Sequence, residues 1–205
     1  LIGGEAAALS ELEAKTKSDA GNTGIADPML ARATTYAMAV LETNASMGRI
    51  VAAPTAGSSG VVPAMLLAAQ DEHGFNDKEL IDALANAAAI GYLITRNATV
   101  AGAEGGCQAE VGAASAMAAS AACELFGGTP AQCFAAASNA LCGLMGRVCD
   151  PVAGLVEAPC QKRNATGVAN AIVSAQIALA GIGNLANFDE TVEAMRRVGN
   201  SLPFE

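Results

Sequence analysis

The chain has 205 residues, enough for one domain with a sizeable core, and 52% of them are apolar while only 3% are aromatic. Its net charge is −9, and it has no cluster of Lys and Arg that could neutralise a phosphate backbone. We therefore expect no nucleic-acid partner. The first residues do not combine a basic start with an apolar run, so we expect no signal peptide and a cytoplasmic protein.

The pattern of apolar residues is helical along the whole chain, and runs that alternate apolar with polar residues hardly occur. An N-cap residue stands directly before a proline, as at the start of a helix, in Asp27-Pro28, Thr129-Pro130 and Asp150-Pro151. In chain order the pattern predicts helices over residues 27–47, 60–72, 77–96, 105–126, 129–145, 164–181 and 189–198. No internal repeat or linker divides them. The prediction is an all-α single domain.

Four segments between these helices lack the pattern of packing elements, and loops carry chemistry more often than cores do. They are residues 53–60, 103–107, 147–151 and 158–164. The first contains the run Thr55-Ala56-Gly57-Ser58-Ser59-Gly60, whose hydroxyls and small residues let backbone N–H groups turn toward a small carboxylate. From the residues alone, a plain glycine turn is the simpler interpretation of this run.

The six cysteines fall into two groups by their surroundings. Three lie among alanines inside predicted helices, where a thiol behaves as a small core residue: Cys123, Cys133 and Cys142. The other three lie beside Gly or Pro at predicted helix starts: Cys107, Cys149 and Cys160. Unpaired backbone N–H groups and the helix dipole favour a thiolate or an anionic cluster at such positions.

Three kinds of site compete for the second group. A disulfide would use two of the cysteines and leave the third unpaired, and the lack of a secretion signal favours a reducing compartment. Zinc would need a fourth ligand at close spacing, and the only histidine, His73, lies in a polar turn that we expect to be exposed. Three thiolates could also hold a cubane iron–sulfur cluster whose fourth iron stays open as a Lewis acid. Spacing alone leaves these alternatives open.

Residues 167–188 carry no charge and are about as long as a membrane span. Several polar residues oppose insertion because each is costly in hydrocarbon, namely Asn170, Ser174, Gln176, Asn184 and Asn187. A helix that is apolar on all sides is also expected at the centre of a helical domain. We therefore expect a central buried helix rather than a membrane segment.

Three long segments resemble the alpha part of the bacterial iron–sulfur-dependent L-serine dehydratases. Residues 44–64 (NASMGRIVAAPTAGSSGVVPA) look like the substrate loop of that family, and residues 104–112 (EGGCQAEVG) and 149–160 (CDPVAGLVEAPC) look like its cluster-binding segments. The pair Arg163-Asn164 is similar to one that follows the last cluster cysteine. The resemblance extends over nearly the whole chain, from about Leu1 to Arg197.

The resemblance implies that Cys107, Cys149 and Cys160 ligate a [4Fe-4S] cluster whose open iron binds the hydroxyl of L-serine. The products would be pyruvate and ammonia, L-threonine would react more weakly, and no pyridoxal phosphate would be needed. It further implies that the substrate binds residues 55–60 together with Asn44 and Asn164. The active site would then lie in loops and at helix N-termini.

Three charged residues near the motifs are candidates for a role in the reaction. Arg163 could pair with the substrate carboxylate or with a surface acid. Glu104 could carry a proton or serve as a charge at a helix N-terminus, and Lys162 could be a base or simply solvated. The sequence does not decide among these alternatives.

Two features of the family are missing from the chain. It has no Ser-Ser-His-Thr-like segment, so we expect a beta subunit or an N-terminal beta domain to supply a histidine. It also stops without the tail that can reach the cluster, so we expect residues 1–205 to form an alpha subunit or a truncated catalytic domain. The alanine-rich helices offer flat apolar faces, which favour an oligomer. A cysteine desulfidase and a non-enzymatic helical assembly protein remain the alternative functions.

Overall fold

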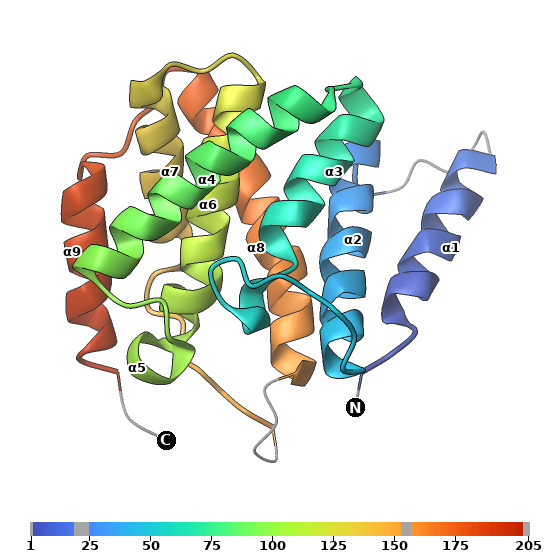
Figure 1. Cartoon of the computed structure of the whole chain (residues 1–205), viewed down its shortest axis with the longest axis horizontal. Helices are drawn as coiled ribbons and strands as arrows, with labels where there is room; N and C mark the ends of the chain where they lie inside the picture. The colour runs from blue at the N-terminus through green and yellow to red at the C-terminus, as the bar shows by residue number, and fades with distance from the viewer. Residues whose placement is uncertain (1, 19–24, 153–156, 203–205) are drawn as a thin grey trace.

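The computed structural model describes residues 2–18, 25–152 and 157–202, and these residues form one all-α domain without a β-strand (Figure 1). The α-helices are α1 (Glu5–Ser18), α2 (Pro28–Ala45), α3 (Val61–His73), α4 (Asp77–Asn97), α5 (Gly102–Cys107), α6 (Ala113–Leu125), α7 (Pro130–Leu144), α8 (Glu157–Leu179) and α9 (Phe188–Gly199). A 3₁₀-helix, η1 (Ala56–Ser58), precedes α3, and a π-helix, η2 (Gln108–Gly112), joins α5 to α6. The predicted fold class is confirmed.

Two of the three predicted Asp-Pro and Thr-Pro helix starts are confirmed. The Asp27 side chain accepts a hydrogen bond from Leu30 N at 3.1 Å, and the Thr129 hydroxyl caps α7 in the same way. The third start is wrong, because Pro151 does not open a helix. The Asp150 carboxylate forms an ion pair with Arg163 instead of capping, and the next described helix is α8.

Helix α8 begins earlier than predicted. It starts at Glu157, so residues 158–164 are helical rather than a loop. Pro159 is the third residue of the helix, where a backbone N–H would have no partner within the helix and a proline is tolerated. Residues 153–156, which belong to the motif around Cys149 and Cys160, lie outside the described part of the chain.

Two further elements were not predicted. Helix α1 has strong helix-forming residues, with Glu5 in its first turn and Lys15 and Lys17 in its last, and this charge pattern could have identified it. The predicted helix 105–126 is in fact interrupted, because α5 meets the π-helix at Cys107 and α6 begins only at Ala113. A break of this kind leaves no periodic signal in the sequence.

The central buried helix is α6, not the uncharged stretch 167–188. Every residue from Ala113 to Cys123 is buried, and α6 packs against α3, α4, α7 and α8. The stretch 167–188 is divided between α8, which ends at Leu179, and α9, which begins at Phe188. None of the described helices is both long and apolar enough to cross a membrane.

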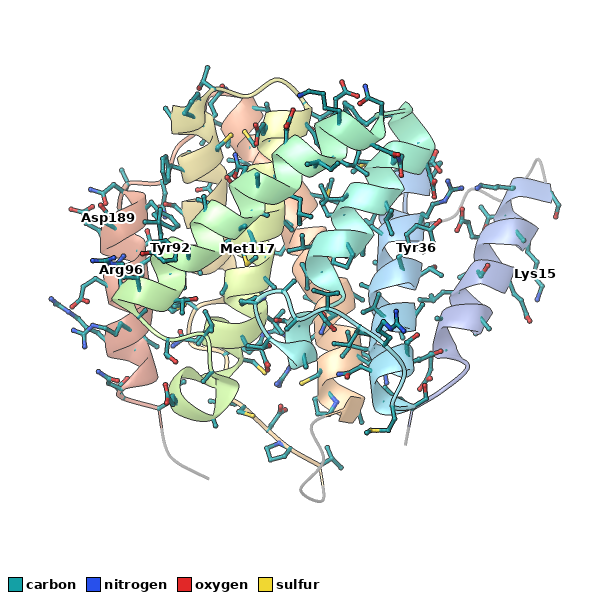
Figure 2. The ribbon with its side chains drawn as sticks, viewed as in Figure 1. Lys15, Tyr36, Tyr92, Arg96, Met117 and Asp189 are labelled. Carbon is teal, nitrogen blue, oxygen red and sulfur yellow. The ribbon has the colours of Figure 1, made fainter. Side chains whose placement is uncertain are left out.

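Small residues allow the helices of this core to approach closely. Met117 lies near the centre of the molecule, where α6 crosses α4 (Figure 2). It packs against Gly91, and a Cβ on that glycine would lie 2.8 Å from the Met117 sulfur. On α8, a Cβ on Gly167 would lie 2.8 Å from Val111 Cγ1. This close packing sets the positions of the helices relative to one another. Their first turns form the site described below.

Candidate active site

Three helical segments begin near one another. Helix α8 and the run from α5 to α6 start at the lower end of Figure 1 and rise from there, and α3 rises from nearer its middle, after η1. Asn164 of α8 connects two of them, because its Oδ1 accepts from Gly60 N at 3.0 Å and its Nδ2 donates to the Gly57 carbonyl at 2.8 Å. Helix N-termini carry partial positive charge and unpaired N–H groups. This end therefore suits a negatively charged group.

Two cysteines and a glutamate meet at this end. One ligand atom from each of Cys107, Glu110 and Cys160 lies within 4.8 Å of the other two, and both cysteines are buried. Cys107 ends α5 and Glu110 follows three residues later, a spacing that places both on one helical face. Cys160 lies in the first turn of α8. We call these three residues the thiol–carboxylate group.

A glycine breaks the helix immediately before Cys107. Gly106 has φ +73° and ψ 178°, a conformation that is essentially restricted to glycine. A Cβ at this position would lie 2.6 Å from the carbonyl oxygen of Arg147, and Gln108 N donates to the same oxygen at 3.1 Å. The break therefore packs the segment that carries Cys149 against the segment that carries Cys107.

The Cys107 thiol has neighbours that favour its thiolate. The hydrogen bond from the Cys160 thiol and the charge of Arg163 lower the pKa of Cys107 to about 7 despite its burial. Arg163 Nη1 donates to Cys107 Sγ at 2.8 Å and pairs with Asp150 Oδ1 at 2.5 Å. The pKa of Cys160 is raised, because its thiol donates to Cys107 and because it is buried. The thiolate is the form of cysteine that binds metals.

Cys149 lies near the thiol–carboxylate group without belonging to it. Its half-buried thiol is on the non-helical segment before α8 and is not among the atoms within 4.8 Å of one another. Burial raises the pKa of Cys149 most, the Glu110 carboxylate raises it further, and the Arg163 guanidinium lowers it. The same two charges act in the same directions on Cys107 and Cys160. The three cysteines of the predicted site therefore share two charged neighbours.

The predicted substrate loop, residues 55–60, contacts the carboxylate of this group. Thr55 Oγ1 donates to Glu110 Oε1 at 2.5 Å and lies 3.0 Å from Ser58 Oγ. A Cβ on Gly57 would lie only 2.7 Å from Glu110 Oε1, so a larger residue here would make the carboxylate shift. The Ser59 hydroxyl is buried and donates to a carbonyl within the loop at 2.7 Å. Thr55 and Gly57 thus reach the group, while Ser59 supports the loop.

Two asparagines hold the backbone of the loop. Asn44 Nδ2, at the end of α2, donates to the carbonyl of the exposed Ala56 at 3.3 Å. Asn164 is fully buried, and its Nδ2 also donates to the Cys160 carbonyl at 2.7 Å. Both residues were predicted to bind substrate, and in this structure both amides bind main-chain atoms.

Neither of the two acid–base candidates belongs to the thiol–carboxylate group. Glu104 is exposed and accepts a hydrogen bond from Thr99 Oγ1 at 2.6 Å, and Lys162 is exposed. The carboxylate in the group is Glu110, which lies in the motif around Cys107 but was not singled out from the sequence. Its spacing of three residues from Cys107 is the signal that could have found it.

The remaining cysteines are placed as predicted with one exception. Cys123 and Cys133 are buried in α6 and α7. The prediction that Cys142 is a core residue is wrong, because it is exposed on the outer face of the last turns of α7. Its sulfur accepts a hydrogen bond from Asn184 Nδ2 at 2.8 Å.

The histidine of the chain is remote from the site. His73 is exposed, as predicted, and its ring packs edge-on against Phe126 with 4.9 Å between the ring centroids. It is the last residue of α3, whereas the site lies at the first turn of that helix. A helix of this length separates its ends by about 18 Å at 1.5 Å per residue.

Comparison with known proteins identifies the family. The sequence pattern of a family described as the serine dehydratase alpha chain matches residues 2–205. The chain belongs to the serine dehydratase alpha chain family. It is 52% identical over 191 residues to the L-serine dehydratase alpha chain of Peptoniphilus asaccharolyticus, which covers 92% of this chain. It is 46% identical over 203 residues to the probable L-serine dehydratase alpha chain of Bacillus subtilis, which covers 99% of it.

The serine dehydratase alpha-type chain spans only part of its relatives. It matches 65% of the length of the Peptoniphilus protein and 66% of the Bacillus protein. The L-serine dehydratase of Mycobacterium bovis is 45% identical over 168 residues, a match that covers 80% of this chain but only 36% of that protein. The complete relatives therefore contain further polypeptide beyond the part that corresponds to this chain.

Proposed function

We propose that this chain is the catalytic part of an iron–sulfur-dependent L-serine dehydratase, which converts L-serine to pyruvate and ammonia. The observation that carries the proposal is the meeting of two buried thiols, Cys107 and Cys160, with the Glu110 carboxylate at a set of helix N-termini. The relatives that carry the name L-serine dehydratase support the same activity and substrate. The free cysteines of the chain favour a reducing compartment, the cytoplasm.

The residues present fit a [4Fe-4S] cluster held by Cys107, Cys149 and Cys160. Thiolates are the usual protein ligands of such clusters, and a pKa of about 7 makes Cys107 available as a thiolate near neutral pH. The converging helix N-termini favour an anionic cluster. When bound, a cluster with three protein ligands supplies one open iron as a Lewis acid for the hydroxyl of the substrate.

The chain's own groups would bind the carboxylate of the substrate. The loop of residues 55–60 and the start of α3 present backbone N–H groups next to the site. Arg163 already lies beside Cys107, and a guanidinium can bind a carboxylate through two parallel hydrogen bonds. Once water has been eliminated, the aminoacrylate product tautomerises and hydrolyses without help. We expect no pyridoxal phosphate, because the open iron would activate the leaving hydroxyl.

The complete enzyme would include a further subunit or domain. This inference rests on the greater length of the relatives and on the position of His73, which lies at the opposite end of α3 from the site. We propose that a beta subunit or beta domain brings a histidine to the thiol–carboxylate group and that the assembly is an oligomer. Light scattering of the purified complete enzyme measures its mass, and a fully active monomer of this chain alone would contradict both points.

The function is tested by anaerobic reconstitution with iron and sulfide. We expect the complete enzyme to bind iron and acid-labile sulfide, to show the visible absorbance of a cluster, and to release pyruvate from L-serine faster than it releases 2-oxobutanoate from L-threonine. An enzyme that contains an intact cluster together with its partner but forms no pyruvate would refute the proposal.

Two assays separate the alternative functions. Release of sulfide from L-cysteine in preference to pyruvate from L-serine would identify a cysteine desulfidase. A protein that takes up neither iron nor labile sulfide under strict anaerobiosis would instead be a helical assembly protein.

A further inference from the structure

We propose that the Glu110 carboxylate binds the ammonium group of the amino-acid substrate and so selects amino acids over hydroxy acids. The proposal rests on the proposed function, because it assigns a role within the same site. Glu110 is the carboxylate that the structure places beside Cys107 and Cys160.

The Glu110 carboxylate is held in place from several sides. Thr55 Oγ1 donates to its Oε1 at 2.5 Å. Two glycines make room for it, since a Cβ on Gly57 would lie 2.7 Å from Oε1 and a Cβ on Gly102 would lie 3.0 Å from Oε2. These contacts come from the substrate loop and from the start of α5, so two separate elements are shaped around one carboxylate.

This carboxylate has no cationic partner within the described part of the chain. The guanidinium at the site, Arg163, forms its ion pair with Asp150 rather than with Glu110. A half-buried carboxylate without a cation loses hydration that a single hydroxyl donor does not fully replace. An ammonium group carries one positive charge and three N–H donors, and it can therefore supply what the site lacks.

The charges of the site match those of a zwitterionic amino acid. Glu110 and Arg163 are opposite charges that both act on Cys107, Cys149 and Cys160. A substrate at the thiols can direct its ammonium to Glu110 and its carboxylate to Arg163 and the helix N-termini. A hydroxy acid without an amino group would leave Glu110 unpaired, and the site would reject it for that reason.

The test replaces Glu110 by Gln in the complete enzyme, prepared anaerobically. The two ligands compared are L-serine and 3-hydroxypropanoate, which keeps the carboxylate and the hydroxyl of serine but lacks its amino group. We expect Glu110→Gln to keep its iron and labile sulfide and to weaken serine binding by about 10- to 100-fold, the usual effect of losing a charged hydrogen bond. Binding of 3-hydroxypropanoate, measured from the visible spectrum and as competitive inhibition, should change by less than about threefold.

Two further variants complete the experiment. Glu110→Asp keeps the charge and should recover part of the preference for serine. Glu124→Gln removes the same charge at the far, exposed end of α6 and should leave both ligands unaffected.

Each other outcome decides against the proposal. Loss of iron from Glu110→Gln would mean that Glu110 helps to hold the cluster. Equal weakening of both ligands would mean a purely structural role, and an unchanged KM with a lower kcat would mean proton transfer. A wild-type enzyme with a full cluster that neither binds nor converts serine would refute the proposed function itself, whereas normal wild-type turnover with unchanged selectivity in Glu110→Gln overturns only the role of Glu110.

Discussion

Cys107 and Cys160 share one property with Cys123 and Cys133. In each pair the two buried thiols form a hydrogen bond that lowers the pKa of one of them to about 7. Burial and contact between thiols therefore do not distinguish a ligand pair from a structural pair. The difference is the charged environment. Arg163 donates to Cys107 at 2.8 Å, Cys107 directly precedes the π-helix η2, and Cys160 lies in the first turn of α8.

Single replacements of the cysteines test this distinction. We expect Ser at Cys107, Cys149 or Cys160 to abolish cluster retention, because a site with three thiolate ligands has no spare one. Ala at Cys123 or Cys133 removes a small buried side chain and should lower the free energy of unfolding by about 1 kcal/mol while the visible absorbance remains. The measurement is iron content and visible absorbance of anaerobic samples.

Cys142→Ala is the matched control, since this thiol is exposed and its hydrogen bond comes from the Asn184 side chain. It should change neither stability nor absorbance. Loss of colour from a folded Cys123 or Cys133 variant would show that the ligands are assigned to the wrong group.

At the scale of elements, the junction around Cys107 connects three parts of the chain. The Gln108 side chain is 1% exposed and both ends of its amide are bonded. Its Nε2 donates to the Met195 carbonyl of α9 at 3.0 Å, and its Oε1 accepts from Gly146 N at 2.8 Å. This amide therefore fixes α9 and the segment leading to Cys149 relative to the π-helix.

The glycine before Cys107 permits this junction and can be tested. Gly106→Ala places a side chain in a glycine-only conformation and against the Arg147 carbonyl, so we expect it to lower the free energy of unfolding by about 2 kcal/mol or more. Because the strain acts on the segments of Cys107 and Cys149, iron content should fall as well. Thermal unfolding and iron analysis measure the two effects.

Gly127→Ala provides the comparison. Gly127 also has a positive φ, +83°, but a Cβ there would meet nothing within 4 Å. It should cost about 1 kcal/mol from backbone strain alone and leave iron content unchanged. Equal iron loss in the two variants would contradict the role given to the contact at Gly106.

Local sequence rules predicted the helices whose ends depend on local contacts. Asp27 and Thr129 cap the helices they precede, so the predicted starts were correct. Asp150 has the same local sequence, yet its carboxylate bonds Arg163, and that choice depends on a distant part of the chain. The motifs likewise predicted one site for Cys107, Cys149 and Cys160, and the structure places Cys107 beside Cys160. The place of Glu110 depends instead on how the loop at Thr55 folds back onto the π-helix.

At the scale of the whole molecule, alanine is what allows so many helices to meet around α6. Every residue from Ala113 to Cys123 is buried, which is possible only if the surrounding helices approach on all sides. Larger side chains would force these helices apart, and their starts would no longer meet at the site. The alanine-rich composition is thus a requirement of the packing as well as a source of helix propensity.

A larger side chain at the centre of α6 tests this requirement. Ala118 is fully buried, and Ala118→Leu forces three carbon atoms into a filled space, so we expect the free energy of unfolding to fall by about 1–3 kcal/mol or more. Ala88→Leu makes the same change on the exposed face of α4, and since Ala and Leu both favour helix its effect should stay within about 0.5 kcal/mol. Denaturant unfolding followed by far-UV circular dichroism gives both values. If Ala118→Leu were as stable as Ala88→Leu, the core around α6 would have room for a larger side chain. Close packing around α6 would then not determine where the first turns of the helices lie.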